Sequence, residues 1–143
     1  MKLLIRRLDP DLPLPTYGRA DDAGLDLLAA EDVRLRPGER SAIRTGIAIA
    51  IPPGYAGFVH ARSGRALREG LALANAPGVV DAGFRGEVKV VAVNLDAGDT
   101  IHIKRGDKVA QLVIQAIDRV ELEEVSELPA SDRGGGGFGS TGL

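Results

Sequence analysis

One segment of the sequence places a carboxylate beside a turn, where it could act on a bound molecule. In GVVDAGFRGEVKV, residues 78–90, a short strand is predicted to end at Asp81, a turn to pass through Gly83, and a second strand to begin near Gly86 to form a hairpin. Asp81 either caps this turn, the commonest role of Asp beside Gly, or serves as a general base on a water molecule. Lys89 lies between two valines and is predicted to leave the core face, toward an anion or solvent.

Three other segments carry polar residues that each allow two interpretations. In AGLDLLA, Asp26 is either a turn residue at a strand end or a carboxylate that holds a hydrated cation. In ARSGRA, the run Arg62, Ser63, Gly64 opens a predicted helix and is either an ordinary cap beside a surface arginine or a phosphate site. In RGDKVAQLVI, Gln111 lies in an alternating strand, as an ordinary polar residue or as a site contact.

The glycine-rich segment RGGGGFGSTG, residues 133–142, formally contains the Gly-x-Gly-x-x-Gly pattern of dinucleotide-binding loops. That fingerprint needs a strand before it and a helix after it, and the sequence predicts neither. No Gly-Lys-Ser/Thr follows the glycines, which excludes a Walker phosphate loop. Acidic residues and a proline precede the segment, so residues 121–143 are predicted to pack no core. They form either a flexible end or an arm that wraps around a phosphate.

Alternating apolar residues predict the strands that must position these groups. The clearest run is Thr45 to Ile51, in which isoleucines recur at every second position. The other predicted strands cover Leu3–Arg7, Val33–Leu35, Ala56–His60, Glu87–Asn94, Thr100–Ile103 and Lys108–Val120. Turn sequences such as Pro37-Gly38 separate them. One short helix is expected from Ser63, as a possible N-cap, to Glu69, with Gly70 just past its end. Many short strands with one helix favour a β-sandwich or jelly roll.

The composition limits the class of protein. At 143 residues the chain has room for one domain, and with no cysteine it cannot form disulfides or thiolate metal sites. The formal net charge of −2 gives no global basic field to attract nucleic acid or an anionic membrane. No apolar stretch approaches the roughly 20 residues of a membrane span. His60 and His102 lie too far apart in sequence for a local ligand pair. A cytoplasmic protein without nucleic-acid or membrane partners is expected.

Together, the segments AGLDLLA, ARSGRA, GVVDAGFRGEVKV, RGDKVAQLVI and RGGGGFGSTG resemble the five motifs of the deoxyuridine triphosphatase (dUTPase) family in order and approximate spacing. The resemblance spans nearly the whole chain. It implies an all-β jelly-roll domain over residues 1–120 with one short helix, and a flexible C-terminal arm over residues 121–143. It also implies a homotrimer with three sites at subunit interfaces, in which each arm completes a neighbouring subunit's site.

The resemblance implies hydrolysis of dUTP to dUMP and pyrophosphate, with water attacking the α-phosphorus. Asp81 would position and deprotonate this water. Mg²⁺ would bind the three phosphates, with Asp26 holding the ion through coordinated waters. Gln111 would contact the α-phosphate or the attacking water, and Arg133 would reach the γ-phosphate once the arm closes. The remaining phosphate contacts implied are Arg62, Ser63 and Gly64.

Base selection is implied to follow from the hairpin, whose backbone would present uracil with an edge resembling a pairing partner. Asn75 matches the family's residue at O4 of the base. Phe84 stands where the family commonly carries a tyrosine, whose ring lies against the deoxyribose, and Phe138 would stack on the uracil. The other substrate contacts implied are Gly78, Val79, Val80, Lys89, Gly139 and Ser140.

Two alternatives remain open. A dCTP deaminase-like enzyme shares the fold and the hairpin, but that group typically has Arg-Ser-Ser where residues 62–64 read Arg-Ser-Gly, and it lacks the glycine-rich final motif. A non-catalytic jelly-roll binding module would retain the fold alone. Such a module would have no reason to keep Asp26, Asp81 and Gln111 together with both arginines.

Overall fold

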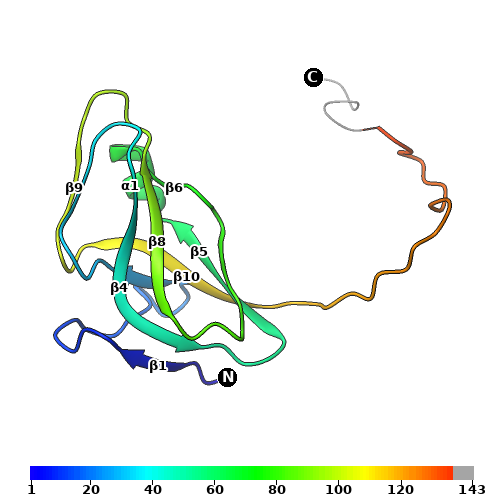
Figure 1. Cartoon of the computed structure of the whole chain (residues 1–143), viewed down its shortest axis with the longest axis horizontal. Helices are drawn as coiled ribbons and strands as arrows, with labels where there is room; N and C mark the ends of the chain where they lie inside the picture. The colour runs from blue at the N-terminus through cyan, green and yellow to red at the C-terminus, as the bar shows by residue number, and fades with distance from the viewer. Residues whose placement is uncertain (137–143) are drawn as a thin grey trace.

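Two four-stranded antiparallel sheets enclose one core in the computed structural model, which describes residues 1–136 (Figure 1). The first sheet has the order β1-β4-β8-β6, formed by Leu4–Arg7, Arg40–Ala50, Glu87–Asn94 and Leu71–Leu73. The second has the order β2-β10-β5-β7, formed by Leu25–Leu28, Lys108–Ala116, Tyr55–Ala61 and Gly78–Val80. A separate ribbon pairs β3, Val33–Leu35, with β9, Ile101–Ile103. The predicted all-β jelly roll with a single short helix is confirmed for this part of the chain.

The core follows from side-chain alternation in the strands. In β8 every second residue is buried, from Val88 to Asn94, while Lys89 is exposed as predicted. Residues from both sheets, including Ile43 and Leu112, belong to one buried apolar cluster. The amide nitrogen of the buried Asn94 side chain donates to the carbonyl oxygens of Leu35 and Asp99, so that this polar group is satisfied.

The predicted strands overlap strands of the structure, but some of their ends differ by several residues. The run predicted at Thr45–Ile51 overlaps the longer β4, which begins at Arg40 and ends at Ala50. The run predicted to reach Val120 ends at Ala116. Strand β6, Leu71–Leu73, was not predicted, because it directly follows Gly70 at the end of the helix, without a separate turn sequence before it.

The only helix in the described part of the chain is α1, Ser63–Glu69, which leads from β5 in one sheet to β6 in the other. The prediction of Ser63 as N-cap was wrong. Arg62 is the N-cap residue, with an extended backbone (φ −88°, ψ 119°) and no side-chain cap hydrogen bond. Gly70 ends the helix as predicted, in the left-handed conformation at φ 69°.

The expected hairpin over residues 78–90 is also corrected. Strand β7 pairs with β5 in one sheet and β8 pairs with β4 and β6 in the other, so β7 and β8 do not pair with each other. The segment between them crosses from one sheet to the other through a turn closed by the Phe84 N–H, which donates to the Asp81 carbonyl oxygen at 3.0 Å. The turn is where it was predicted, but the two strands belong to different layers.

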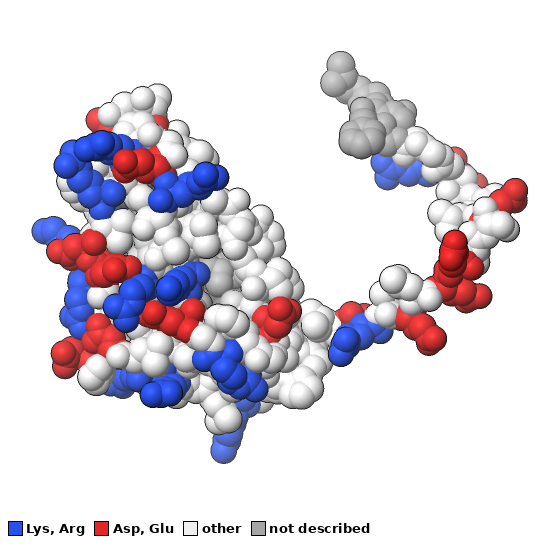
Figure 2. All heavy atoms as spheres, in the orientation of Figure 1, with Lys and Arg blue, Asp and Glu red and all other residues white. Residues whose placement is uncertain are grey.

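The chain beyond β10 leaves the body as a long exposed segment. Residues 117–136 contain no helix or strand and extend away from the sheets (Figure 1). Acidic side chains are spaced along this segment (Figure 2). For residues 121–136, this arrangement agrees with the expectation that this part of the chain packs no core. No helix among residues 1–136 is long and apolar enough to cross a membrane.

Candidate functional site

A cleft of about 390 Å³ lies where the beginning of α1 meets β2 and β10. It brings together five residues that the sequence predicted for phosphate or metal binding, although they are far apart in the chain: Asp26, Arg62, Ser63, Gly64 and Gln111. We call this the phosphate cleft. Its wall also includes Arg19, Asp22, Arg65, Arg68 and Lys108.

Asp26 is held between two cations at the floor of the phosphate cleft. It lies in β2, and antiparallel pairing with β10 places it opposite Gln111. Arg62 Nε is 3.3 Å from Asp26 Oδ1, and Lys108 Nζ is 2.6 Å from Asp26 Oδ2. The Asp26 side chain is only 12% exposed, so these ion pairs are stronger than pairs on the open surface. Asp26 is therefore a fixed carboxylate inside a strand and not a turn residue at a strand end.

Gln111 is fixed from two sides. Its Nε2 donates to the carbonyl oxygen of Ala61 at 3.2 Å, which leaves Oε1 as an acceptor. The buried Gly24 packs against the same side chain, and a Cβ at Gly24 would lie 2.5 Å from Gln111 Oε1. Only glycine fits there without displacing the amide. The sequence AGLDLLA thus positions both Asp26 and, through its glycine, Gln111.

A second cleft, of about 280 Å³, lies at the crossing from β7 to β8. We call it the Asp81 cleft; it is lined by Val79, Val80, Asp81, Phe84, Glu87, Val88 and Lys89. Asp81 is exposed, and so are the apolar side chains of Val79 (60%) and Phe84 (43%). The Phe84 ring lies across Gly86, where a Cβ would be 2.7 Å from Cζ. An accessible carboxylate beside an exposed aromatic ring can take an aromatic or sugar-like ligand.

The side-chain amide of Asn75 lies against the backbone of Gly78, the residue that precedes Val79 of this cleft. Its Nδ2 lies beside Gly78, 3.1 Å from where a Cβ of that residue would stand. Gly78 is buried in β7 opposite Val59. A larger residue at 78 would therefore move the Asn75 amide, which is predicted to contact the base.

The two clefts have no lining residue in common. The residues predicted for phosphate and metal binding lie in one cleft, and the predicted base Asp81 lies in the other. One chain therefore does not bring the predicted base together with the predicted phosphate contacts.

Arg133, the one predicted arm contact within the described residues, lines neither cleft. Arg133 is exposed in the tail, where its Nε donates to the carbonyl oxygen of Gly136 at 2.8 Å. Phe138, Gly139 and Ser140 lie outside the described residues.

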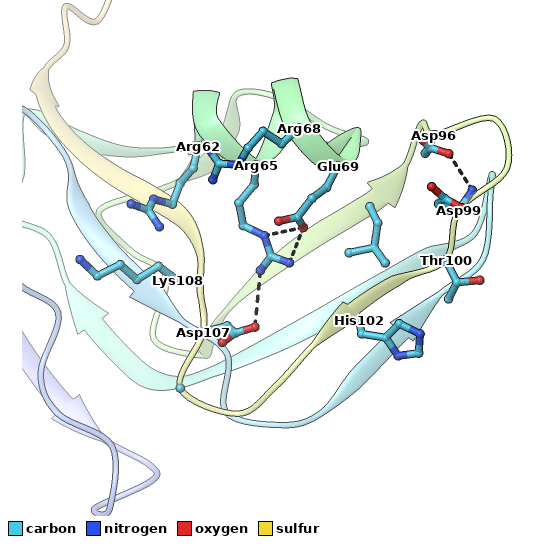
Figure 3. Close-up of a pocket in the computed structure, with 12 residues that line it drawn as sticks. Arg62, Arg65, Arg68, Glu69, Asp96, Asp99, Thr100, His102, Asp107 and Lys108 are labelled. Carbon is cyan, nitrogen blue, oxygen red and sulfur yellow. Dashed lines mark hydrogen bonds and ion pairs between the residues drawn. The ribbon is translucent and has the colours of Figure 1, made fainter.

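Sequence reasoning missed several cations of the site. Lys108, Arg65 and Arg68 line the phosphate cleft, and they also border a larger cleft of about 660 Å³ between α1 and β9 (Figure 3). The spacing of three between Arg62, Arg65 and Arg68 is the signal that could have found the helical pair, because such residues share a helix face. Nothing local points to Lys108, whose partner Asp26 is 82 positions away in sequence and is reached only through the pairing of β2 with β10.

The pKa shifts resolved in this structure belong to structural ion pairs and turns. The side-chain hydrogen bond from Arg105 lowers the pKa of Asp9. Backbone N–H groups of Asp99 and Gly98 lower the pKa of Asp96, and the hydrogen bond to Glu87 raises the pKa of Arg44. These groups hold loops and a strand bulge in place, and none of them lines the phosphate cleft.

Comparison with known proteins identifies the family. A family model described as dUTPase matches residues 11–142. The chain belongs to the dUTPase family. The deoxyuridine 5'-triphosphate nucleotidohydrolase of Thermobifida fusca (strain YX) is 60% identical over 142 residues, which cover 99% of this chain and 79% of that protein. The resemblance seen in the five sequence motifs is therefore confirmed.

Solved dUTPase structures share the fold. A mutant of the Staphylococcus bacteriophage 80alpha dUTPase with dUpNHpp aligns with a TM-score of 0.92 at 30% identity, over 99% of both chains. A mutant dUTPase from phage phi11 of S. aureus aligns with a TM-score of 0.82 at 31% identity, over 91% of this chain and 100% of that one, and is described with a structural Mg(II) ion. Membership of this enzyme family favours a dUTP nucleotidohydrolase over both the deaminase and the binding module.

Proposed function

We propose that this member of the dUTPase family hydrolyses dUTP to dUMP and pyrophosphate, which limits uracil in DNA and supplies dUMP for dTMP synthesis. The observation that carries the proposal is the phosphate cleft, which gathers Asp26, the Arg-Ser-Gly run at residues 62–64 and Gln111 around one hollow. Cationic side chains and accessible backbone N–H groups are the partners that a triphosphate needs. The family assignment supports deoxyuridine as the nucleoside.

Magnesium fits the residues at Asp26. Residues 1–136 contain no group of three His, Asp or Glu side chains arranged to hold a metal ion. Mg²⁺ keeps several waters and commonly binds through one or two carboxylates plus substrate phosphates, so one fixed carboxylate facing a triphosphate suffices. Asp26 would hold the ion through coordinated waters, with Arg62 and Lys108 keeping the carboxylate oriented. When bound, the ion would neutralise phosphate charge in the transition state.

The catalytic base in this proposal is Asp81. Its exposed carboxylate would accept the proton of the attacking water as the water adds to the α-phosphorus and the bond to the bridging oxygen of pyrophosphate breaks. Gln111, fixed by Ala61 and Gly24, would direct its free Oε1 or its amide at the water or the α-phosphate. Lys89 lines the Asp81 cleft and would face the substrate there.

The base would be recognised in the Asp81 cleft. The backbone of Gly78, Val79 and Val80 would hydrogen-bond the uracil edge, with the Asn75 amide at O4. Phe84 would lie against the deoxyribose by its ring face, which needs no hydroxyl and so tolerates the absence of a tyrosine. Cytosine would leave buried polar groups unpaired, which costs several orders of magnitude in discrimination.

The protein would work as a homotrimer. Support comes from the separation of the two clefts, because a reaction that needs both requires a neighbouring copy to bring its Asp81 cleft against the phosphate cleft. Residues 1–120 would form the jelly-roll domain and residues 121–143 the arm that closes a neighbour's site. Arg133, Gly139 and Ser140 of the arm would contact the phosphates, and Phe138 would stack on the uracil. A cytoplasmic location, without nucleic-acid or membrane partners, remains a prediction from the sequence.

One assay tests the proposed reaction against its alternatives. The full chain is incubated with Mg²⁺ and either dUTP or dCTP, and pyrophosphate and ammonia are measured. Pyrophosphate from dUTP is expected. Ammonia from dCTP without pyrophosphate from dUTP would establish the deaminase instead, and no product from either nucleotide would favour the binding module.

A further inference from the structure

The phosphate cleft holds more cationic side chains than carboxylates. Arg19, Arg62, Arg65, Arg68 and Lys108 line it, against Asp22 and Asp26. Five cations gathered around two carboxylates repel one another unless an anion lies between them. The lining therefore carries an excess of positive charge, which attracts an anionic ligand.

Most of these cations already have a carboxylate partner. Arg62 and Lys108 share Asp26. The side chain of Arg65 is only 12% exposed and is fixed by Glu69 at 2.6 Å and Asp107 at 3.7 Å. The guanidinium groups of Arg19 and Arg68 make no ion pair and no hydrogen bond within residues 1–136, and of these two arginines only Arg68 lies in α1. Figure 3 shows Arg68 lying along α1, apart from the cluster of Arg65, Glu69 and Asp107.

The guanidinium of Arg68 lies over the backbone of Gly64. A Cβ on Gly64 would stand 3.1 Å from Nη1, 3.4 Å from Nη2 and 3.6 Å from Cζ of Arg68. Glycine at 64 thus lets the guanidinium cover the turn that is proposed to hold phosphates. An arginine in this position offers two parallel N–H donors to phosphate oxygens, which a lysine cannot do.

We propose that Arg68 is a further substrate-binding residue, which contacts the part of the triphosphate that leaves as pyrophosphate. The assignment to that part rests on the proposed function, in which Gln111 lies at the α-phosphate. Gln111 contacts Gly24 and Ala61, whereas Arg68 contacts Gly64, so the two side chains stand at different parts of the cleft wall. In this arrangement, a ligand without the outer phosphates would not reach Arg68.

The test measures binding of inorganic pyrophosphate and of dUMP by calorimetry, together with kcat and KM for dUTP. The variants are Arg68→Gln, which removes the charge, and Arg68→Lys, which keeps the charge but loses the paired donors. The matched control is Arg36→Gln, an exposed arginine outside all the clefts described above. Arg68→Gln is expected to weaken pyrophosphate binding about ten- to a hundredfold, to raise KM by a similar factor and to leave dUMP binding unchanged. Arg68→Lys is expected to show a pyrophosphate affinity and a KM between those of the wild type and those of Arg68→Gln.

Two results would overturn the proposal. One is pyrophosphate binding by Arg68→Gln equal to that of Arg36→Gln. The other is an equal loss of dUMP and pyrophosphate binding, which would mean that Arg68 supports the shape of the cleft and does not contact the outer phosphates. Failure of the wild-type chain to hydrolyse dUTP would instead refute the proposed function, while the pyrophosphate measurement still decides the role of Arg68.

Discussion

The carboxylate of Asp81 lies at the mouth of its cleft, and its main-chain carbonyl closes the turn to Phe84. The Asp81 side chain does not take part in the hydrogen bond that closes this turn. A change confined to the carboxylate therefore leaves the local backbone intact, which allows chemistry and structure to be separated at this residue.

Asp81→Asn is expected to lower kcat by about 10²- to 10⁴-fold, because an amide cannot accept the proton of the attacking water. Binding of a non-hydrolysable dUTP analogue should stay nearly unchanged. Steady-state kinetics and calorimetry check the two quantities. If analogue binding falls as far as kcat, Asp81 has a structural role.

Gly24→Ala tests the support behind Gln111. The added Cβ would stand 2.5 Å from Gln111 Oε1, so the amide must move. We expect a loss of about 1–3 kcal/mol in unfolding free energy together with reduced kcat. Thermal unfolding and kinetics of Gly98→Ala provide the control, because nothing lies within 4 Å of a Cβ at Gly98. Equal behaviour of the two variants would contradict the close packing of Gly24.

Single residues of the site could be predicted once the five segments were considered together. Asp26, Gln111 and Asp81 each allowed two interpretations within their own segments, and the resemblance to the dUTPase motifs implied their roles. The structure places each of them on the wall of a cleft. Lys108 and Arg68 were missed, because their importance depends on what lies opposite them in the fold.

At the scale of elements, alternation located most strands because burial on one face imposes a period of two. Which sheet a strand joins is a tertiary property, so residues 78–90 read as a hairpin although β7 and β8 belong to different layers. The bounds of α1 agree with the prediction, but its N-cap was assigned one residue too late. Serine is a residue type that commonly caps helices, which pointed to Ser63. The extended backbone that precedes the helix instead belongs to Arg62, which directly follows the end of β5.

The loop before β10 is attached to the N-terminal segment by a charge pair. Arg105 Nη2 lies 2.8 Å from Asp9 Oδ1, and this contact lowers the pKa of Asp9 below its ordinary value of 3.8. Since the carboxylate titrates at a lower pH in the folded state, the pair stabilises the fold above the unfolded pKa. That stabilisation is lost as the pH falls through the folded pKa.

Asp9→Asn should therefore lower Tm at neutral pH and make no difference in strongly acidic solution. Melting curves of both proteins between neutral and acidic pH measure this. A difference in Tm that persists below the folded pKa of Asp9 would show that the carboxylate charge is not the cause.

For the whole molecule, the separation of the two clefts predicts complementation between inactive chains. Two variant proteins, one with Asp81→Asn and one with Arg62→Gln, are unfolded, mixed in equal amounts and refolded together. About a quarter of the interfaces would then pair an intact Asp81 with an intact Arg62 of the neighbour. Activity is expected to rise above that of either variant refolded alone. No gain would mean that each site is complete within one chain.

Truncation before Arg133 tests the arm. Activity should fall, because the proposed γ-phosphate contact and the stacking phenylalanine are removed, while assembly is retained since the sheets are untouched. Sedimentation and kinetics measure the two effects. Loss of assembly would assign the segment to the interface instead of the site.

The exposed tail also makes the protein suitable for site-specific labelling. The whole sequence has no cysteine and no tryptophan, and Ser126 lies in the exposed segment beyond β10. A single cysteine introduced there would be the only thiol in the chain, and a fluorophore attached to it would report the position of the arm without any background signal.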